Sequence, residues 1–171
     1  MTKVNYLVPI LNCNYLLQLS IGTGKLYGVS YLAIKDHEAM PATRHEVSNI
    51  RQSIASHEDE KIISQFKQYL SNPAIAWKID LVWPGVSDFQ KTVLDYLSTI
   101  PLGTTKTYGQ VANDLQTSAR AVGNACRRNP FPITIPCHRV VAQNGLGGYD
   151  GDINEGRLAI KSLLLKHEQA L

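Results

Sequence analysis

Three prolines crowd into one short segment of the chain, at positions 130, 132 and 136, directly before Cys137 and His138. A proline lacks a backbone N–H group and fixes its own φ angle, and it pushes the residue before it toward an extended conformation. This segment therefore cannot form the interior of a helix. We expect it to hold Cys137 in a fixed, non-helical position.

The thiol of Cys137 has two interpretations at this level. The neighbouring His138 and Arg139 favour the thiolate, the reactive form of a cysteine, so the residue can be a nucleophile. Alternatively, it is a small buried side chain that happens to precede a histidine. Neither Cys13 nor Cys126 forms a C-x-x-C pair, so the spacing excludes a zinc site of that type and a disulfide framework. Reduced thiols are typical of a cytoplasmic protein.

Composition and the first residues narrow the class of protein further. Apolar residues make up 44% of the chain and charged residues 18%, which is typical of a globular protein with a core and excludes a disordered chain. Asparagines and a glutamine interrupt the apolar residues of the segment 1–19, so we expect neither a secretory signal nor a membrane span.

Residues 1–85 are predicted to form a small α/β domain. Two apolar stretches at residues 15–21 and 26–34 flank a glycine-containing connection at 22–25, a pattern that predicts a β-hairpin. The polar residues 36–60 predict a loop with one short helix.

The end of this first half combines a helix, a strand and a boundary. Apolar residues over 61–70 have helical spacing, and the acidic run 58–60 suits the first turn of that helix. Residues 74–82 alternate between apolar and polar, which predicts a strand. The Trp-Pro-Gly sequence at 83–85 is typical of a domain boundary.

Residues 86–171 are predicted to form a mainly helical domain. Capping-box sequences begin at Ser87 and Thr107, and Ser118 is a further candidate cap. Apolar spacing then predicts a first helix with Phe89 on its buried face, followed by helices near 108–115, 118–128 and 155–168. The two short helices near 108–115 and 118–128, joined by a tight turn, are typical of a helix-turn-helix.

Positive charge gathers around this pair of helices. Residues 106–139 have a net charge of +4, whereas the whole chain has +3; the ionised residues are Lys106, Asp114, Arg120, Arg127, Arg128 and Arg139. Such a cluster indicates contacts with DNA phosphates, although a solvated helix face is an equal alternative. The second helix is rich in small residues, including Ala119, Ala121 and Gly123, and lets a backbone approach closely. We therefore expect recognition of shape and backbone more than of base sequence.

Several motifs together resemble one family. They are Pro-Cys-His-Arg-Val at 136–140, Tyr-Gly-Gln-Val-Ala at 108–112, Ser-Ala-Arg-Ala-Val-Gly at 118–123, Arg-Arg-Asn-Pro at 127–130, Gly-Gly-Tyr at 147–149 and Leu-Leu-Leu-Lys-His-Glu at 163–168. In order and spacing they are similar to the O6-alkylguanine-DNA alkyltransferases, also called methylated-DNA–protein-cysteine methyltransferases. The similarity covers residues 86–171. It implies a ribonuclease-H-like α/β N-terminal domain and a C-terminal domain with a winged-helix-like helix-turn-helix.

The resemblance implies a DNA repair reaction in which each molecule acts once. An alkyl group on guanine O6 is transferred irreversibly to the Cys137 sulfur, O4-alkylthymine being a second candidate substrate. His138 takes the thiol proton through water, and Glu168 orients His138. Tyr108 donates a hydrogen bond to a guanine ring nitrogen. Asn129 ties the helix near 118–128, the recognition helix, to the segment 130–137 that ends at Cys137, the cysteine loop.

The resemblance also implies the DNA contacts and the pocket. Arg120 fills the space left by the flipped guanine. The other expected DNA-binding residues are Thr107, Ala119, Ala121, Gly123, Arg127 and Arg128, and the expected pocket residues are Pro132, Val140, Tyr149 and Lys161. No metal or cofactor is expected. The partner is double-stranded DNA that contains O6-alkylguanine, bound by a cytoplasmic monomer, with side-by-side binding left open.

Two features depart from the family, and two other functions compete with alkyl transfer. The loop over 150–157 is longer than in relatives and borders the alkyl pocket, and Cys13 lacks partners for the zinc site of some relatives. A DNA-damage binder without activity is disfavoured because such proteins lack the cysteine. A cysteine hydrolase leaves Arg120 and the helix-turn-helix unexplained.

Overall fold

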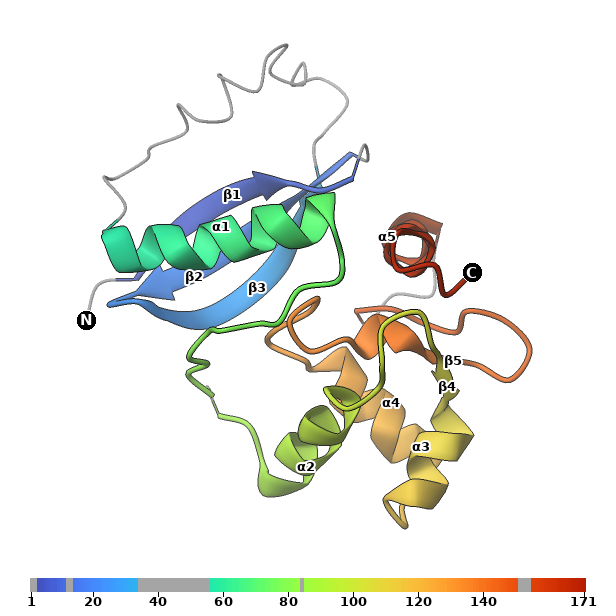
Figure 1. Ribbon diagram of the computed structural model, residues 1–171. Helices are drawn as coiled ribbons and strands as arrows, with labels where there is room; N and C mark the ends of the chain where they lie inside the picture. Colours follow the sequence, from blue (N-terminus) through green and yellow to red (C-terminus); the bar gives the residue numbers. More distant parts are fainter. Residues whose placement is uncertain (1–2, 12–13, 34–55, 84, 151–154) are drawn as a thin grey trace. The chain divides into compact units, whose positions relative to one another are not determined.

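The structure is a computed structural model and describes residues 3–11, 14–33, 56–83, 85–150 and 155–171 (Figure 1). The chain forms two compact units, Met1–Pro84 and Gly85–Leu171. This division falls one residue before the boundary expected from the sequence. The expected loop over 36–60 lies largely outside the described residues, as does Cys13.

The described residues of the first unit form a three-stranded antiparallel sheet with one helix on its face (Figure 1). Its strands are β1 Val4–Pro9, β2 Tyr15–Gly22 and β3 Lys25–Ala33, in the order β1-β2-β3, and its helix is α1 His57–Ser71. Strands β2 and β3 confirm the predicted hairpin. Strand β1 was not predicted: its buried Tyr6 and Val8 alternate with exposed Asn5 and Pro9, so the asparagine lies on the outer face without interrupting the strand.

Helix α1 begins where the acidic run was expected to place it. The Ser56 hydroxyl accepts the N–H of Asp59 at 3.2 Å, and Glu58, Asp59 and Glu60 occupy the first turn. The Asp59 carboxylate also accepts the N–H of Gly24 at 3.0 Å. Gly24 lies in the β2–β3 turn with a φ of +69°, a conformation that glycine adopts readily. The contact therefore joins the turn of the hairpin to the start of α1.

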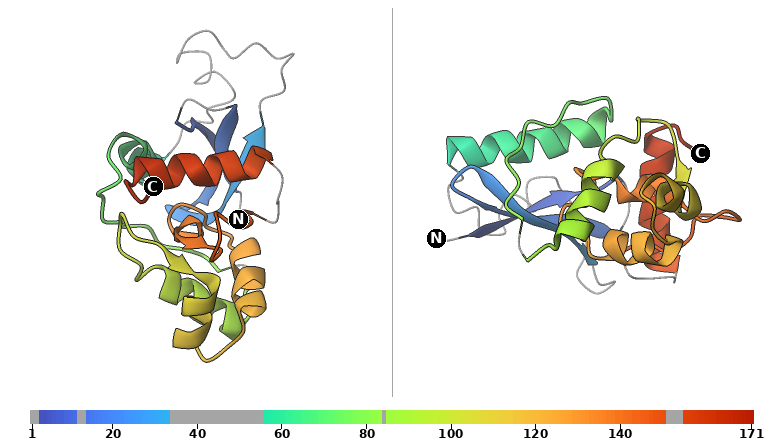
Figure 2. Two further views of the ribbon diagram at one scale, coloured as in Figure 1. Left: turned by 90° about the vertical axis from the view of Figure 1, so that its right-hand side faces the viewer. Right: turned by 90° about the horizontal axis from the view of Figure 1, so that it is seen from below.

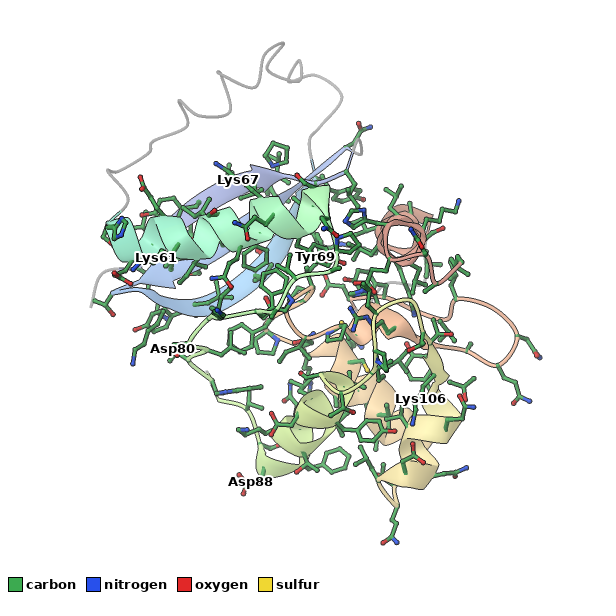
Figure 3. All side chains as sticks on the ribbon, in the orientation of Figure 1. Lys61, Lys67, Tyr69, Asp80, Asp88 and Lys106 are labelled. Carbon is green, nitrogen blue, oxygen red and sulfur yellow. The ribbon has the colours of Figure 1, made fainter. Side chains whose placement is uncertain are left out.

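The prediction of a strand over 74–82 is wrong. The described segment is extended, but only an isolated bridge joins Leu81 to Leu26 of β3. Side chains hold the rest: the Gln65 amide accepts from the N–H of Lys78 and donates to its carbonyl, and the Trp77 ring lies 5.6 Å from the ring of Tyr69, which Figure 3 labels. Alternating burial is thus a property of any extended chain packed on one side, with or without strand pairing.

In the part of the second unit that the structure describes, the chain forms four α-helices, a short 3-10 helix and a small parallel sheet (Figures 1 and 2). The helices are α2 Asp88–Leu97, α3 Tyr108–Asp114, α4 Ala119–Arg127 and α5 Glu155–His167. Strand β4 Lys106–Thr107 pairs with β5 Val140–Val141, a sheet that was not predicted because each strand has two residues. This pairing brings the start of α3 beside the chain that follows Cys137.

Each predicted capping serine or threonine begins its helix. Ser87, Thr107 and Ser118 accept the N–H of the third residue that follows them, at 3.2, 3.1 and 3.2 Å. Thr107 and Gln110 form the full reciprocal capping box, whereas the Gln90 side chain donates to the Arg128 carbonyl at the end of α4, at 2.7 Å. The box predicted at Ser87 therefore forms only its serine half, and the Gln90 side chain instead joins α2 to the end of α4.

The core of the second unit lies between these helices. Phe89, expected on the buried face of α2, is 47% exposed, because the buried face runs instead through Val93, Leu94 and Leu97. Apolar side chains of α5 and of the segment 130–140 complete the core. Its fully buried members include Ile100, Val111, Val122, Phe131, Val140, Ile160, Leu164 and Leu165. No helix in the described part of the chain is long and apolar enough to cross a membrane.

Candidate active site

Cys137 lies at the start of a single 3-10 turn, Cys137–Arg139, directly after the proline-rich segment. The three prolines precede this turn, so they shape its approach without entering a helix. The Cys137 N–H donates to the Ile135 carbonyl at 2.8 Å. The expectation of a fixed position thus holds, and the expectation of a wholly non-helical one is corrected to one turn of 3-10 helix.

The Asn129 side chain joins the end of α4 to the thiol. Its amide N–H groups donate to the Cys137 sulfur at 3.2 Å and to the Ile135 carbonyl at 2.9 Å, and its oxygen accepts the Phe131 N–H at 2.9 Å. The side chain is buried, so these bonds are protected from water. One residue therefore fixes the sulfur relative to the helix-turn-helix.

The Cys137 thiol is protonated at neutral pH. Burial raises its pKa to about 11, and the nearby Asp150 carboxylate raises it too, whereas the Asn129 hydrogen bond and the Lys161 charge lower it. The thiolate expected from the neighbouring basic residues is therefore not favoured at rest. Arg139 does not stabilise the thiolate, because its side chain donates to the Glu168 carboxylate instead. Nucleophilic attack by this sulfur therefore needs a base that removes the thiol proton.

The His138 ring is completely buried against the Glu168 carboxylate, with His138 Nε2 2.9 Å from Glu168 Oε1. Arg139 donates to the same carboxylate from Nε at 2.7 Å and from Nη2 at 3.0 Å, and to the Ile100 carbonyl from Nη1 at 2.6 Å. A carboxylate only accepts hydrogen bonds, so His138 Nε2 carries the ring hydrogen. Sequence reasoning missed Arg139 as the third member of this cluster.

The other ring nitrogen of His138 is available to take a proton. Nδ1 is buried and has no hydrogen-bond partner among the described residues. Burial lowers the pKa of the ring below its ordinary value of 6.5, against the opposing effect of Glu168, so the ring is neutral at pH 7. A neutral imidazole whose Nε2–H is bonded to a carboxylate presents a basic lone pair at Nδ1.

A cavity of about 480 Å³ opens in front of Cys137. The residues that line it come from α3, α4, the cysteine turn and the loop before α5: Tyr108, Ala119, Arg120, Gly123, Cys126, Arg127, Cys137, Gly148, Tyr149 and Asp150. Cys126 is thus a wall of the pocket, and Asp150 belongs to the loop that was expected to border it. Burial raises the pKa of the Cys126 thiol, which keeps it protonated.

Three of the four expected pocket residues are not among those that line the cavity. Pro132 and Val140 are buried in the cysteine loop and in β5, where they pack against the core. Lys161 is completely buried on α5, and its Nζ donates to the carbonyls of Val140, Leu146 and Gly148 at 2.6, 2.6 and 3.1 Å. Burial lowers its pKa to about 8. The lysine therefore holds the pocket wall from behind; only Tyr149 lines the cavity as expected.

Tyr108 projects from the first residue of α3 into the cavity. Its hydroxyl donates to the Gly148 carbonyl at 3.2 Å, and burial raises its pKa, so it remains a donor at neutral pH. Gly147 has a φ of +70°, and a Cβ there would lie 3.0 Å from the Tyr108 ring. Glycine is thus required for the close approach of this loop to the tyrosine.

Helices α3 and α4 lie side by side and form the helix-turn-helix (Figure 2). Ala119, Arg120, Arg127 and Arg128 are exposed on α4 and at its end, while Ala121, Gly123 and Thr107 are partly buried. The basic cluster is smaller than the sequence suggested. Lys106, labelled in Figure 3, donates to Asp114 at 2.7 Å and also to Tyr96, and Arg139 is bound to Glu168. Within the described residues, three arginines remain without an ion pair: Arg120, Arg127 and Arg128.

Comparisons with known sequences agree with this arrangement. The family model "6-O-methylguanine DNA methyltransferase, DNA binding domain" matches residues 88–170. The methylated-DNA–protein-cysteine methyltransferase of Methanocaldococcus jannaschii is 50% identical over 76 residues, which are 44% of this chain and 46% of that protein. The enzyme of the same name from Methanosarcina mazei is 39% identical over 112 residues, 64% of this chain and 67% of that protein. The chain thus spans about half the length of several curated relatives and two thirds of the Methanosarcina mazei protein.

Solved structures extend the similarity over the whole chain. The O6-methylguanine methyltransferase of Mycobacterium tuberculosis is similar at 27% identity with a TM-score of 0.70, over 98% of this chain and 94% of that one. The OGT protein of the same organism in complex with DNA is similar at 28% identity with a TM-score of 0.64, over 91% and 87%. Sequence and fold together place this mixed α/β chain in the methylated-DNA–protein-cysteine methyltransferase family.

Proposed function

We propose that this protein repairs double-stranded DNA by transferring an alkyl group from guanine O6 to the Cys137 sulfur, once per molecule. One observation carries the proposal. A buried thiol faces a cavity walled by the second helix of a helix-turn-helix, and the next residue in the chain is a buried histidine with an unused nitrogen. The names of relatives refer to methylated DNA and O6-methylguanine, which supports this substrate class.

In the transfer, the thiol proton moves to His138 Nδ1 through a bridging water while the sulfur attacks the alkyl carbon. The S–C bond forms, the O6–C bond breaks, and its electron pair leaves with the guanine. The Tyr108 hydroxyl donates to a guanine ring nitrogen and stabilises this charge. The guanine then takes a proton and returns to the duplex. The thioether that remains on Cys137 is stable, so the protein is consumed.

Glu168 and Arg139 keep His138 ready for this step. Glu168 accepts the Nε2 hydrogen and so reserves Nδ1 as the base, and its negative charge stabilises the imidazolium that forms. Arg139 holds both carboxylate oxygens and anchors the pair to the Ile100 carbonyl. Asn129 holds the sulfur in line with the cavity.

The exposed side of α4 is the proposed DNA surface. Removing a guanine from the stack costs about a few kcal/mol, and Arg120, exposed at the cavity mouth, offsets part of this cost by filling the vacated space. Arg127 and Arg128 contact phosphates together with Thr107 at the start of α3. The small residues Ala119, Ala121 and Gly123 admit the DNA backbone.

We further propose a ribonuclease-H-like first unit, a winged-helix-like second unit, and a monomer that acts in the reducing cytoplasm.

Intact mass spectrometry tests the proposal. The protein is incubated with a duplex that contains one O6-methylguanine, and a gain of one methyl group is expected. Cys137→Ser must abolish the gain while duplex binding persists. Tight binding of the damaged duplex with no change in mass would instead indicate a DNA-damage binder, and repeated turnover of thioester or amide substrates without DNA would indicate a hydrolase.

A further inference from the structure

The cavity in front of Cys137 has one carboxylate among its lining residues, that of Asp150. It lies at the end of the loop that Lys161 holds through the carbonyls of Leu146 and Gly148. The other ionised lining residues are Arg120 and Arg127, both on α4. Asp150 is thus the acidic residue among those that line the cavity.

An ion pair with Arg157 fixes the position of Asp150. Arg157, in the first turn of α5, donates from Nη1 to Asp150 Oδ2, and the two side chains are 29% and 30% exposed. Arg157 does not line the cavity. The pair is therefore oriented, with its carboxylate on the cavity side. Asp150 has a φ of +48°, a conformation that aspartate and asparagine adopt more readily than most residues.

The charge of Asp150 reaches the reacting sulfur. It raises the pKa of Cys137, in opposition to the larger effect of the buried Lys161 charge. Asp150 and Cys137 line the same cavity, so a group that enters it is exposed to the charge of this carboxylate.

We propose that the Asp150 carboxylate, held by Arg157, makes the pocket select uncharged alkyl groups over negatively charged ones. The inference rests on the proposed function, because it concerns the group that Cys137 accepts. The carbon that Cys137 attacks must lie within bonding reach of the sulfur, so a carboxymethyl group brings a second negative charge into the field of Asp150. Partial burial weakens the screening of this repulsion by water. The bonds broken and formed are the same as for methyl transfer.

Two adducts of matched size test the charge effect. Single-turnover rate constants are measured on duplexes that contain O6-carboxymethylguanine or its neutral isostere O6-carbamoylmethylguanine. Repulsion between like charges in a partly buried pocket predicts that the wild type prefers the neutral adduct by severalfold. Asp150→Asn keeps the backbone conformation accessible and should reduce this ratio severalfold, whereas Arg157→Gln leaves the carboxylate without its counter-charge and should increase it.

The opposite signs separate charge from structure. If the ion pair only braces the loop, both substitutions change the ratio in the same direction, which overturns the proposal, as does a ratio near one in the wild type. Asp95→Asn, which removes an exposed carboxylate that binds Lys91 on α2, is the matched control and should leave the ratio unchanged. Methyl transfer from O6-methylguanine is measured in parallel: its absence in the wild type refutes the proposed function, not the selectivity of the pocket.

Discussion

Replacing Glu168 with glutamine perturbs the proposed base without changing the size of the side chain. In the native protein the carboxylate accepts one hydrogen bond from His138 and two from Arg139, at 2.7–3.0 Å. A glutamine oxygen can satisfy some of these donors, but it leaves the largely buried Arg139 guanidinium without a counter-charge. Breaking a buried ion pair in this way costs about 3–5 kcal/mol of stability.

The same substitution slows transfer for a separate reason. Neutral glutamine does not stabilise the imidazolium and does not enforce the tautomer with Nδ1 free, so much of the benefit of base catalysis is lost. General-base catalysis contributes about 10²–10⁴-fold, and we expect Glu168→Gln to slow single-turnover methyl transfer by about 10²-fold or more. The melting temperature should fall by about 10 °C, from the stability loss above and the usual response of a protein of this size.

Rapid-quench measurements on an O6-methylguanine duplex give the rate, well below the melting temperature of the variant. Fluorescence anisotropy on an undamaged duplex should show that DNA binding is retained, because Glu168 lies in the buried cluster and not among the exposed residues of α4. Glu58→Gln, which removes an exposed carboxylate bound to Lys61 on α1, is the control and should transfer at the wild-type rate. A folded Glu168→Gln protein with the wild-type rate would refute the role given to this carboxylate.

Three further predictions test other parts of the account. Because burial holds the pKa of His138 below 6.5, the unfolded chain binds more protons here as the pH falls through 6.5; melting curves should show the contribution of His138 to stability disappearing at lower pH, so that His138→Gln has a flatter profile from pH 7 to 5. Arg120→Ala should weaken binding of the damaged duplex and slow repair, while free O6-benzylguanine, which needs no base flipping, reacts nearly as before if the pocket admits it; equal losses on both substrates would exclude the proposed filling role. Lys161→Met should leave three carbonyls without their donor and slow the reaction with free O6-benzylguanine about tenfold or more; a wild-type rate would show that the loop needs no such clamp.

The sequence predicted best those features whose cause is local. Ser87, Thr107 and Ser118 begin helices because a side-chain oxygen next to free N–H groups needs no distant partner. The resemblance placed Asn129, His138 and Glu168 in one site, and the structure brings them together. Their chemical roles remain predictions.

Features that depend on partners far away in the chain were not predicted from the sequence. Arg139 was counted with the DNA-binding charges because nothing local indicates that its partner, Glu168, lies 29 positions away. The sheet of β4 and β5 pairs residues of ordinary composition across a similar separation. Lys161 was assigned to the pocket by resemblance alone, and only the fold shows that its ammonium group faces three backbone carbonyls.

The most direct test of the central claim is an end-point titration of the protein with an excess of O6-methylguanine duplex, followed by peptide mapping of the modified chain. Transfer should stop at one methyl group per chain, and this group should be on the peptide that contains Cys137. Transfer that continues beyond one equivalent, or a methyl group found on Cys126 instead, would contradict this claim.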